Sequence, residues 1–239
     1  MSLKNLSEIG IIVQARLSSV RVPRKMLKPF AGTTLLDILF KKLTTSLVIP
    51  RSNIIFSAHE PQLQEVGLKW GVEIFPRSSE SAAEETNLGR MLEWHNRIPY
   101  KYVVCISATA PLLKQETIER FIQEYISTEV RTLYGVFEKK TLYWDNEGRQ
   151  LNEPPGLIET VNTKLIDPIY EAGHCISASQ LDCGFSKGLY LDELWPQKIN
   201  PFVISQVESF DIDEHWQFDL AEAMFQLSLP PSQRHERSG

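Results

Sequence analysis

The sequence has few cysteines and no long apolar run. Its cysteines, Cys105, Cys175 and Cys183, show no Cys-x-x-Cys spacing, which favours reduced thiols in a cytoplasmic protein. No stretch of about 18 apolar residues is present, so the sequence predicts no membrane-spanning helix. The first ten residues lack the apolar core of a signal peptide. We therefore expect a cytoplasmic location and no membrane partner.

The chain also lacks an excess of positive charge. Its formal net charge of -5 argues against a protein that binds nucleic acid, because such proteins usually carry a basic surplus. Its histidines show no HxxxH or HxH spacing, which argues against a zinc site. No G-x-S-x-G motif is present either, so hydrolase chemistry has no support.

Strand-length apolar runs alternate with helical patterns in the first half of the chain. The predicted strands cover residues 9–13, 53–58, 72–75, 102–106 and 132–137. The predicted helices cover residues 35–43, with Thr33 or Thr34 as the cap, 62–70, 88–97 and 115–126. This alternation predicts an α/β fold with a mostly parallel sheet covered on both faces. Ligands of such sheets bind beyond the carboxyl ends of the strands.

The second half of the chain shows a different composition. Residues 138–200 are richer in Gly, Pro, Tyr and Asn and have weak periodicity, which indicates an inserted lobe with irregular strands and dimer contacts. A strand at 202–204 and a helix at 214–227 follow. We predict a single domain over 1–229 and a flexible tail at 230–239.

Four cations lie within ten residues directly after the first predicted strand: Arg16, Arg21, Arg24 and Lys25. The stretch lacks the glycines of a P-loop or a dinucleotide fingerprint. Backbone amides at a strand-to-loop turn can hold phosphate oxygens, and arginine and lysine neutralise their charge. The spacing is compatible with a triphosphate-binding loop, but taken alone it favours a solvated basic loop. If Lys25 is an exposed loop cation, its removal should reduce turnover far more than stability.

Two aspartates near the end of the chain form a second candidate feature. On extended backbone, Asp211 and Asp213 would point to the same side, two residues apart. Two carboxylates suit Mg²⁺, which completes its coordination with water and phosphate oxygens. Either aspartate could instead cap the helix that begins near Glu214. The spacing alone leaves both interpretations open.

Three motifs in order resemble those of a known family. They are I-I-x-Q-A-R-x-x-S-x-R-x-P-x-K-x-L-K-P-x-x-G at 11–32, A-T-A-P-L at 108–112, and F-D-I-D at 210–213 with D-L-A-E at 219–222. They resemble the sugar cytidylyltransferases, which include the acylneuraminate (CMP-sialic acid), pseudaminate, legionaminate and CMP-Kdo synthetases and the spore-coat polysaccharide cytidylyltransferases. The resemblance implies a three-layer, Rossmann-like nucleotidyltransferase with a small dimerisation lobe.

The resemblance also assigns roles to residues at the nucleotide. It implies that the CTP phosphates bind the loop amides near Ala15 and the side chains of Arg16, Ser19, Arg21 and Lys25. It implies a cytosine contact from Arg77 and Ala82, where R-S-S-E-S-A partly matches the family's R-P-x-E-L-A. Arg16 and Lys25 would be catalytic, because they neutralise charge on the reacting phosphates.

The implied reaction joins CMP from CTP to a sugar acid. The anomeric hydroxyl of a nonulosonic (sialic-like) or related 2-keto-3-deoxy acid would attack the α-phosphorus and release pyrophosphate. Asp211 and Asp213 would hold Mg²⁺ as cofactor. The partners expected from the resemblance are CTP, a sugar acid and a second copy of the chain in a homodimer.

The sequence departs from the family mainly on the acceptor side. Ser107 stands where the sialate branch has glutamine, Leu113 where it has arginine, and Met26 where it often has asparagine. Ser107 and Lys114 are therefore the expected substrate-binding residues. His174, beside Gly173, could also touch substrate, although a loop histidine with a structural hydrogen bond is the favoured interpretation. The acceptor stays open. Two other functions also stay open: a metal-dependent glycosyltransferase that uses a nucleotide sugar, and a non-catalytic nucleotide-binding homologue.

Overall fold

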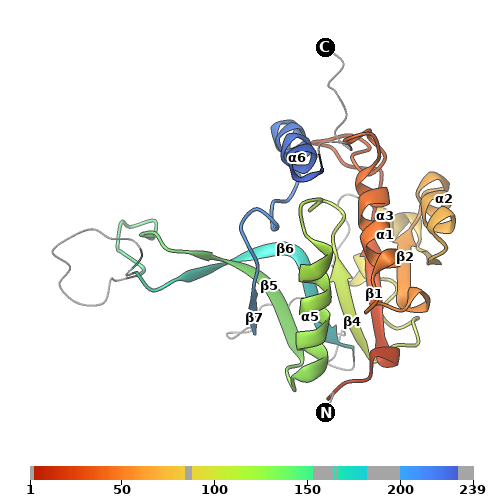
Figure 1. Cartoon of the computed structure of the whole chain (residues 1–239), viewed down its shortest axis with the longest axis horizontal. Helices are drawn as coiled ribbons and strands as arrows, with labels where there is room; N and C mark the ends of the chain where they lie inside the picture. Colours follow the sequence, from red (N-terminus) through yellow and green to blue (C-terminus); the bar gives the residue numbers. More distant parts are fainter. Residues whose placement is uncertain (1–2, 84–87, 153–163, 165, 182–199, 231–239) are drawn as a thin grey trace.

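A single seven-stranded sheet forms the centre of the molecule (Figure 1). The computed structural model describes residues 3–83, 88–152, 164, 166–181 and 200–230. The strand order is β3-β2-β1-β4-β6-β5-β7. The strands are β1 (Ile9–Gln14), β2 (Ile54–Ala58), β3 (Glu73–Pro76), β4 (Tyr102–Ile106), β5 (Thr132–Lys139), β6 (Ile169–Gln180) and β7 (Pro201–Val203).

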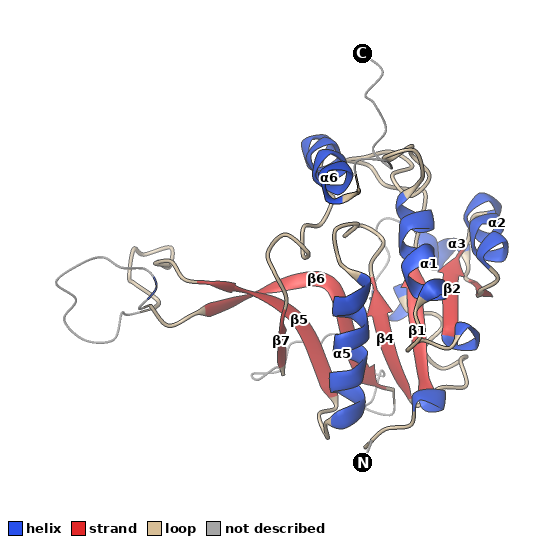
Figure 2. Ribbon diagram, viewed as in Figure 1, coloured by secondary structure: helices blue, strands red, loops and turns tan. Residues whose placement is uncertain are grey.

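The described strands run in one direction except for β6, which is antiparallel to both of its neighbours, β4 and β5. This mixed, mostly parallel sheet confirms the predicted fold class. The separate inserted lobe expected within 138–200 is partly wrong, because β6, a strand of 12 residues, lies inside the main sheet. Beyond the sheet, β5 and β6 continue as a two-stranded arm that projects from the body (Figure 2).

The helices agree with the predicted segments at most positions. They are α1 (Leu35–Thr45), α2 (Pro61–Trp70), α3 (Ser79–Ala82), α4 (Leu88–Met91), α5 (Gln115–Ser127) and α6 (His215–Ser228), with 3₁₀ turns η1 (Leu6–Glu8) and η2 (Arg51–Asn53). The Thr34 side chain accepts the Asp37 N–H at the start of α1, as predicted. Gly71 ends α2 in the left-handed conformation, at φ 65°. No described helix is long and apolar enough to cross a membrane.

The helix predicted for 88–97 is wrong beyond Met91. Residues 92–97 form turns, in which the N–H groups of His95 and Arg97 each bond to a carbonyl three residues earlier. The apolar residues of this segment do not line one face of a helix. Leu92 and Trp94 instead pack with Ile12 on the sheet. Burial of these large side chains offsets the loss of regular helical hydrogen bonds.

The two faces of the sheet follow the alternation of side chains along β1. Ile11 and Val13 point into the main core, which also holds residues of α1, α2 and α5. Ile12 points to the opposite face, where Trp94 is fully buried. Helices therefore cover one face, and the segment after α4 covers part of the other.

A separate cluster of apolar side chains packs the segment between β1 and α1 against α6 and the residues before it. The ring of Phe30 lies edge-on to that of Phe218 in α6, with centroids 5.3 Å apart. The Ala31 N–H donates to the Glu222 carboxylate over 2.6 Å. Ile212 is fully buried in the same cluster. Burying each such side chain contributes about 1.5–3 kcal/mol, so the C-terminal aspartates are firmly held beside the N-terminal basic loop.

Candidate active site

The candidate site lies where the loops after β1, β3 and β4 meet the segment before α6. Because β1 to β4 are parallel, their carboxyl ends share one edge of the sheet. A cavity of about 240 Å³ opens there, called the basic cavity below. It is lined by Gln14, Ala15, Arg16, Ser19, Val20, Arg21, Lys25, Met26, Arg77, Ser81, Met91, Ser107, Thr109 and Asp213. The lining thus brings together four cations and one carboxylate.

Side-chain bonds fix the basic loop at its start. The Arg16 guanidinium donates to the Ala83 carbonyl over 2.9 Å, and the Ser18 hydroxyl to the Ala82 carbonyl over 3.2 Å. The Leu17 N–H donates to the Glu60 carboxylate over 2.7 Å, and the Ala15 N–H to a β2 carbonyl. These two amides are already engaged, so the phosphate contacts expected from the loop fall to its side chains and later residues. Ala82 itself does not line the cavity.

Arg21 and Lys25 lie against the acidic residues before α6. The Arg21 guanidinium is 2.9 Å from the Asp213 carboxylate and 3.4 Å from that of Glu214. The Lys25 ammonium is 3.5 Å from the same Asp213 oxygen. The loop cations and the acidic motif, about 190 residues apart in sequence, therefore neutralise each other in the structure.

Lys25 is not the exposed cation that the sequence suggests. Only 12% of its side chain is exposed, and its ammonium donates to the Ile212 carbonyl over 2.6 Å. A charged hydrogen bond of this kind contributes about 1.5–3 kcal/mol, so Lys25 also holds the loop to the C-terminal segment. The premise of the prediction about its removal, an exposed cation, is therefore wrong. Arg21, 57% exposed, fits the description of a solvated cation better.

Arg77, directly after β3, lines the basic cavity. Its side chain is 4% exposed, and Nη2 donates to the Ala15 carbonyl over 2.9 Å. Burial lowers the pKa of Arg77 to about 10, which leaves it charged at neutral pH. Its Nε is buried without a hydrogen-bond partner among the described residues. Arg77 therefore fixes the turn after β1 and adds positive charge to the base of the cavity.

The two aspartates differ in their surroundings. Asp213 lines the basic cavity, whereas Asp211 does not, and its Oδ1 is buried without a hydrogen-bond partner among the described residues. Helix capping by either aspartate is wrong, because Glu214 is the N-cap and pairs with Gln217 in a capping box. Both carboxylates are thus free of a capping role. No group of three or more His, Cys, Asp or Glu side chains suited to a metal occurs in the described ranges.

A two-carboxylate Mg²⁺ site needs no such group. Magnesium keeps several waters and takes further oxygens from phosphates, so two aspartates beside a phosphate-binding loop are a sufficient protein contribution. The unpartnered buried oxygen of Asp211 and the cavity position of Asp213 fit that donor set.

The loop after β4 is held from both sides. The Ser107 and Thr109 hydroxyls lie 2.6 Å apart at the cavity wall, and the Thr109 carbonyl accepts the Ile212 N–H. The buried ammonium of Lys42 donates to the carbonyls of Pro111 and Leu113 over 2.6 and 2.7 Å. The structure therefore places Ser107 at the site through a network that the sequence motifs do not reveal.

Lys114 is not brought to the site. Its side chain is exposed at the start of α5, and its N–H donates to the Glu208 carboxylate over 3.2 Å. It lines neither the basic cavity nor its neighbour.

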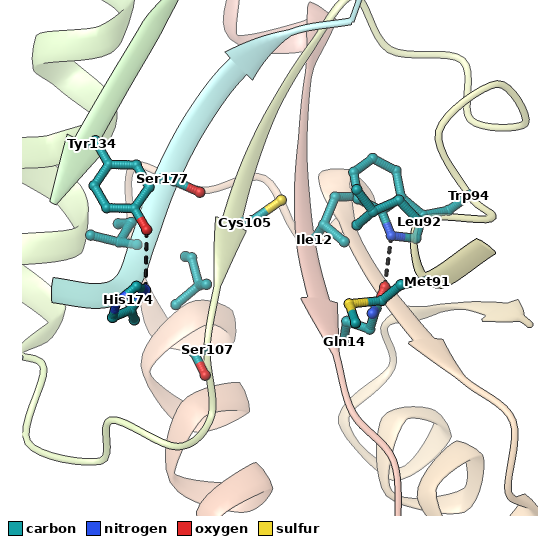
Figure 3. Close-up of a pocket in the computed structure, with 12 residues that line it drawn as sticks. Ile12, Gln14, Met91, Leu92, Trp94, Cys105, Ser107, Tyr134, His174 and Ser177 are labelled. Atoms are coloured by element: carbon teal, nitrogen blue, oxygen red, sulfur yellow. Dashed lines mark hydrogen bonds between the residues drawn. The ribbon is translucent and has the colours of Figure 1, made fainter. Parts of the chain in front are cut away.

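A second cavity of about 210 Å³ adjoins the basic cavity and shares Gln14, Met91 and Ser107 with it. We call it the strand cavity. One wall carries polar side chains of β5 and β6, and the other carries apolar side chains (Figure 3). Its remaining residues are Ile12, Leu92, Trp94, Cys105, Ile106, Tyr134, His174, Ile176 and Ser177. The sequence leaves His174 as a structural loop histidine or a substrate contact and gives Tyr134 no role. The loop position is wrong, because His174 lies within β6, and strand pairing rather than a local motif brings it to Tyr134.

Comparison with known proteins decides the family. Residues 10–165, more than half of the chain, match the family described as Cytidylyltransferase. The chain belongs to the cytidylyltransferase family. The matched range contains the whole basic loop, Arg77 and the loop after β4, so most of the basic cavity lies in the part that matches the family.

Two curated relatives agree with this placement, and one solved structure shares the fold. Pseudaminic acid cytidylyltransferase of Campylobacter jejuni subsp. jejuni is 28% identical over 144 residues, 57% of this chain and 59% of that protein. Spore coat polysaccharide biosynthesis protein SpsF of Bacillus subtilis is 25% identical over 126 residues, 50% of each chain. The chain thus spans about half the length of the curated relatives that it matches. A structure of CMP:2-keto-3-deoxy-manno-octonic acid synthetase complexed with CTP shares the fold, with a TM-score of 0.68 at 12% identity over 93% of this chain and 100% of that one.

Proposed function

We propose that the chain transfers CMP from CTP to the anomeric hydroxyl of a nonulosonic acid or a related 2-keto-3-deoxy sugar acid and releases pyrophosphate. The observation that carries the proposal is the basic cavity, where four cations and Asp213 meet at the carboxyl ends of parallel strands. A triphosphate is the ligand class that suits this charge. The names of the relatives, pseudaminic acid cytidylyltransferase among them, support CTP and a sugar acid as substrates.

In the proposal, the triphosphate replaces the carboxylates as partner of the loop cations. Lys25 and Arg21 exchange their contacts with Asp213 and Glu214 for phosphate oxygens, while Arg16 and Ser19, which line the same cavity, bind further phosphate oxygens. Arg77, which is buried and lines the same cavity, would contact the cytosine. Ala82 would support the basic loop, because its carbonyl accepts a hydrogen bond from the Ser18 hydroxyl.

Asp211 and Asp213 would hold Mg²⁺, which neutralises phosphate charge and orients the leaving pyrophosphate when bound. The acceptor oxygen forms a bond to the α-phosphorus while the bond to pyrophosphate breaks, and the acceptor proton goes to solvent. The protein contributes positions and charges rather than a covalent intermediate. Lys25 and Arg16 are the catalytic side chains in this scheme, because they neutralise charge on the phosphates that react.

The acceptor would lie next to Ser107, at the wall shared by the two cavities. Lys114 has no part in the proposal, because it lines neither of them. A homodimer is part of the proposal: the β5–β6 arm projects from the body, where it is accessible to a second copy (Figure 2).

The test is pyrophosphate release with Mg²⁺, each of the four nucleoside triphosphates, and a panel of sialic, legionaminic, pseudaminic and Kdo-type acids. We expect release with CTP and one class of acid, and none when CTP or the acid is omitted. Asp211→Ala serves as the inactive control. Release from CTP that does not depend on any acid would contradict the transfer reaction, and the absence of CTP binding in calorimetry would contradict the nucleotide assignment.

A further inference from the structure

The pairing of β5 with β6 contains a large irregularity beside the strand cavity. Tyr134 pairs with Ser177, but Val136 pairs with Ala172, so residues 173–176 of β6 lie opposite the single residue Gly135. Bulges of this kind bend a strand and re-aim side chains, and they are frequent next to active sites. The irregularity lies at the level where β6 meets the carboxyl end of β4.

Two glycines make this irregular pairing possible. A Cβ atom on Gly135 would lie 2.7 Å from the Ile176 side chain and 2.9 Å from its carbonyl oxygen. A Cβ atom on Gly173 would lie 2.9 Å from the Gly135 carbonyl oxygen. Since real Cβ contacts are longer, the two backbones approach this closely only because both residues are glycine.

His174 follows directly and has a left-handed backbone, with φ of 51°. This conformation is uncommon outside glycine, and it clusters at sites where the surrounding structure imposes it. The ring lines the strand cavity, and the Tyr134 hydroxyl lies 3.3 Å from Nδ1 (Figure 3). Because Tyr134 occupies Nδ1, the remaining nitrogen, Nε2, is the one available for a ligand.

The chemistry of the strand cavity selects a class of ligand. Hydroxyl groups of Ser107, Tyr134 and Ser177 can bond to sugar hydroxyls, and the opposite wall of Ile12 and Trp94 suits methyl or acetyl groups. Among the described residues that line this cavity, His174 is the side chain that can carry a positive charge. A carboxylate bound here would therefore lie against the imidazole.

We propose that His174, positioned by Tyr134, is the specificity-determining residue of the acceptor site and binds the carboxylate of the sugar acid. The inference rests on the proposed function and adds to it the place of the acceptor and the group that recognises its charge. Since the strand cavity shares Gln14, Met91 and Ser107 with the basic cavity, an acceptor held by His174 lies beside the nucleotide.

The experiment compares the acid that the wild type uses with the carboxamide of the same sugar, in wild type and His174→Asn. Asparagine tolerates the left-handed backbone but carries no charge. We expect the KM for the acid to rise at least tenfold in His174→Asn, with little change for the carboxamide. The preference for acid over carboxamide should therefore fall, while the Kd for CTP stays within twofold. His215→Asn, at an exposed histidine that lines neither cavity, is the matched control.

Tyr134→Phe provides an independent variant if His174→Asn melts early. Loss of the hydroxyl should raise the KM for the acid severalfold and leave the melting temperature and the Kd for CTP unchanged, whereas Tyr170→Phe in the exposed part of β6 should change none of them. If both variants keep the wild-type preference for the acid over the carboxamide, the inference about His174 is overturned and the proposed function is not. A parallel loss of CTP binding would also overturn it, by placing His174 at the nucleotide. A wild type that uses no acid would overturn the proposed function together with this inference.

Discussion

The basic cavity takes its charged side chains from loops, whereas the strand cavity takes most of its polar side chains from strands. Arg16, Arg21 and Lys25 follow β1 within one short stretch, and Asp213 joins them through the packing of α6. Tyr134 and His174 are brought together by one bulged pairing of β5 with β6. A loop can change partners when a ligand arrives, but a strand pair fixes its side chains in advance.

The two cavities also differ in how their charge is balanced without a ligand. In the basic cavity, Asp213 neutralises Arg21 and Lys25, so a triphosphate must displace a carboxylate to bind. In the strand cavity, the described lining contains no carboxylate that competes for His174. Mg²⁺ and the triphosphate should therefore bind cooperatively, because a cation that takes Asp213 releases the loop cations for the phosphates.

The largest effect should come from Asp213→Asn, which tests this exchange. We expect kcat with Mg²⁺ to fall about 1,000-fold, equivalent to about 4 kcal/mol, because a ligand to the metal is lost. Without metal, the variant should bind CTP at least as tightly as the wild type, because the carboxylate that competes for Lys25 is gone. Pyrophosphate release and calorimetry with and without Mg²⁺ measure the two quantities.

Asp145→Asn is the control for that experiment, since Asp145 does not line the basic cavity and accepts bonds from Glu147 and Arg149 within its own turn. Its kinetics should match the wild type. Asp213→Asn with weaker CTP binding in the absence of metal would contradict the idea that the carboxylate competes with phosphate.

Lys25→Met should have the next largest effect and separates the two roles of Lys25. We expect kcat/KM to fall about 100-fold, equivalent to about 2.7 kcal/mol, because a charge near the phosphates is lost. The free energy of unfolding should also fall by about 1.5–3 kcal/mol, because the Ile212 carbonyl loses its donor. Urea denaturation measures stability. A variant as stable as the wild type would show that this hydrogen bond contributes nothing to the fold.

The same contrast between loops and strands explains how much the sequence could predict. Local signals located the parallel half of the sheet, the cap at Thr34 and the end of α2 at Gly71. The cations after β1 and the carboxylate of Asp213, which meet in the basic cavity, could be chosen because each feature is contiguous in sequence.

The rest depends on pairing that no local pattern specifies. Most of β6 is built of small or polar residues, so its central place in the sheet was not visible from periodicity. The position of His174 depends on the register between β5 and β6, and a shift of one residue would turn it to the other face. Lys42 was missed for a related reason, because its partners lie about 70 residues away in the loop after β4.

Lys42 supports the loop that both cavities share, and it should make stability depend on pH. Burial lowers the pKa of Lys42 to about 8, against 10.5 for the unfolded chain. Between these values the unfolded chain keeps a proton that the folded chain has lost, so the free energy of unfolding rises with pH. From pH 8 to pH 10, this group should contribute a rise of about 2 kcal/mol.

Lys42→Met should remove this rise without adding a charge of the opposite sign. Denaturation in urea at pH 8, 9 and 10, for wild type and Lys42→Met, isolates the contribution as the difference between the two slopes. Equal slopes would show that the buried amine keeps its proton throughout the range. Lys41→Met, one residue away on the exposed side of α1, should leave the wild-type slope unchanged.

Arg21→Gln should produce the smallest effect and completes the comparison within the basic loop. Because 57% of the Arg21 side chain is exposed, water screens its interaction with phosphate far more than that of Lys25. We expect the KM for CTP to rise less than tenfold, kcat to stay within threefold, and stability to change by under about 1 kcal/mol. Raising the salt concentration should shrink the difference from wild type, because exposed charges are screened first. A loss as large as that of Lys25→Met would mean that Arg21 becomes buried when CTP binds, and that the basic loop closes over its ligand.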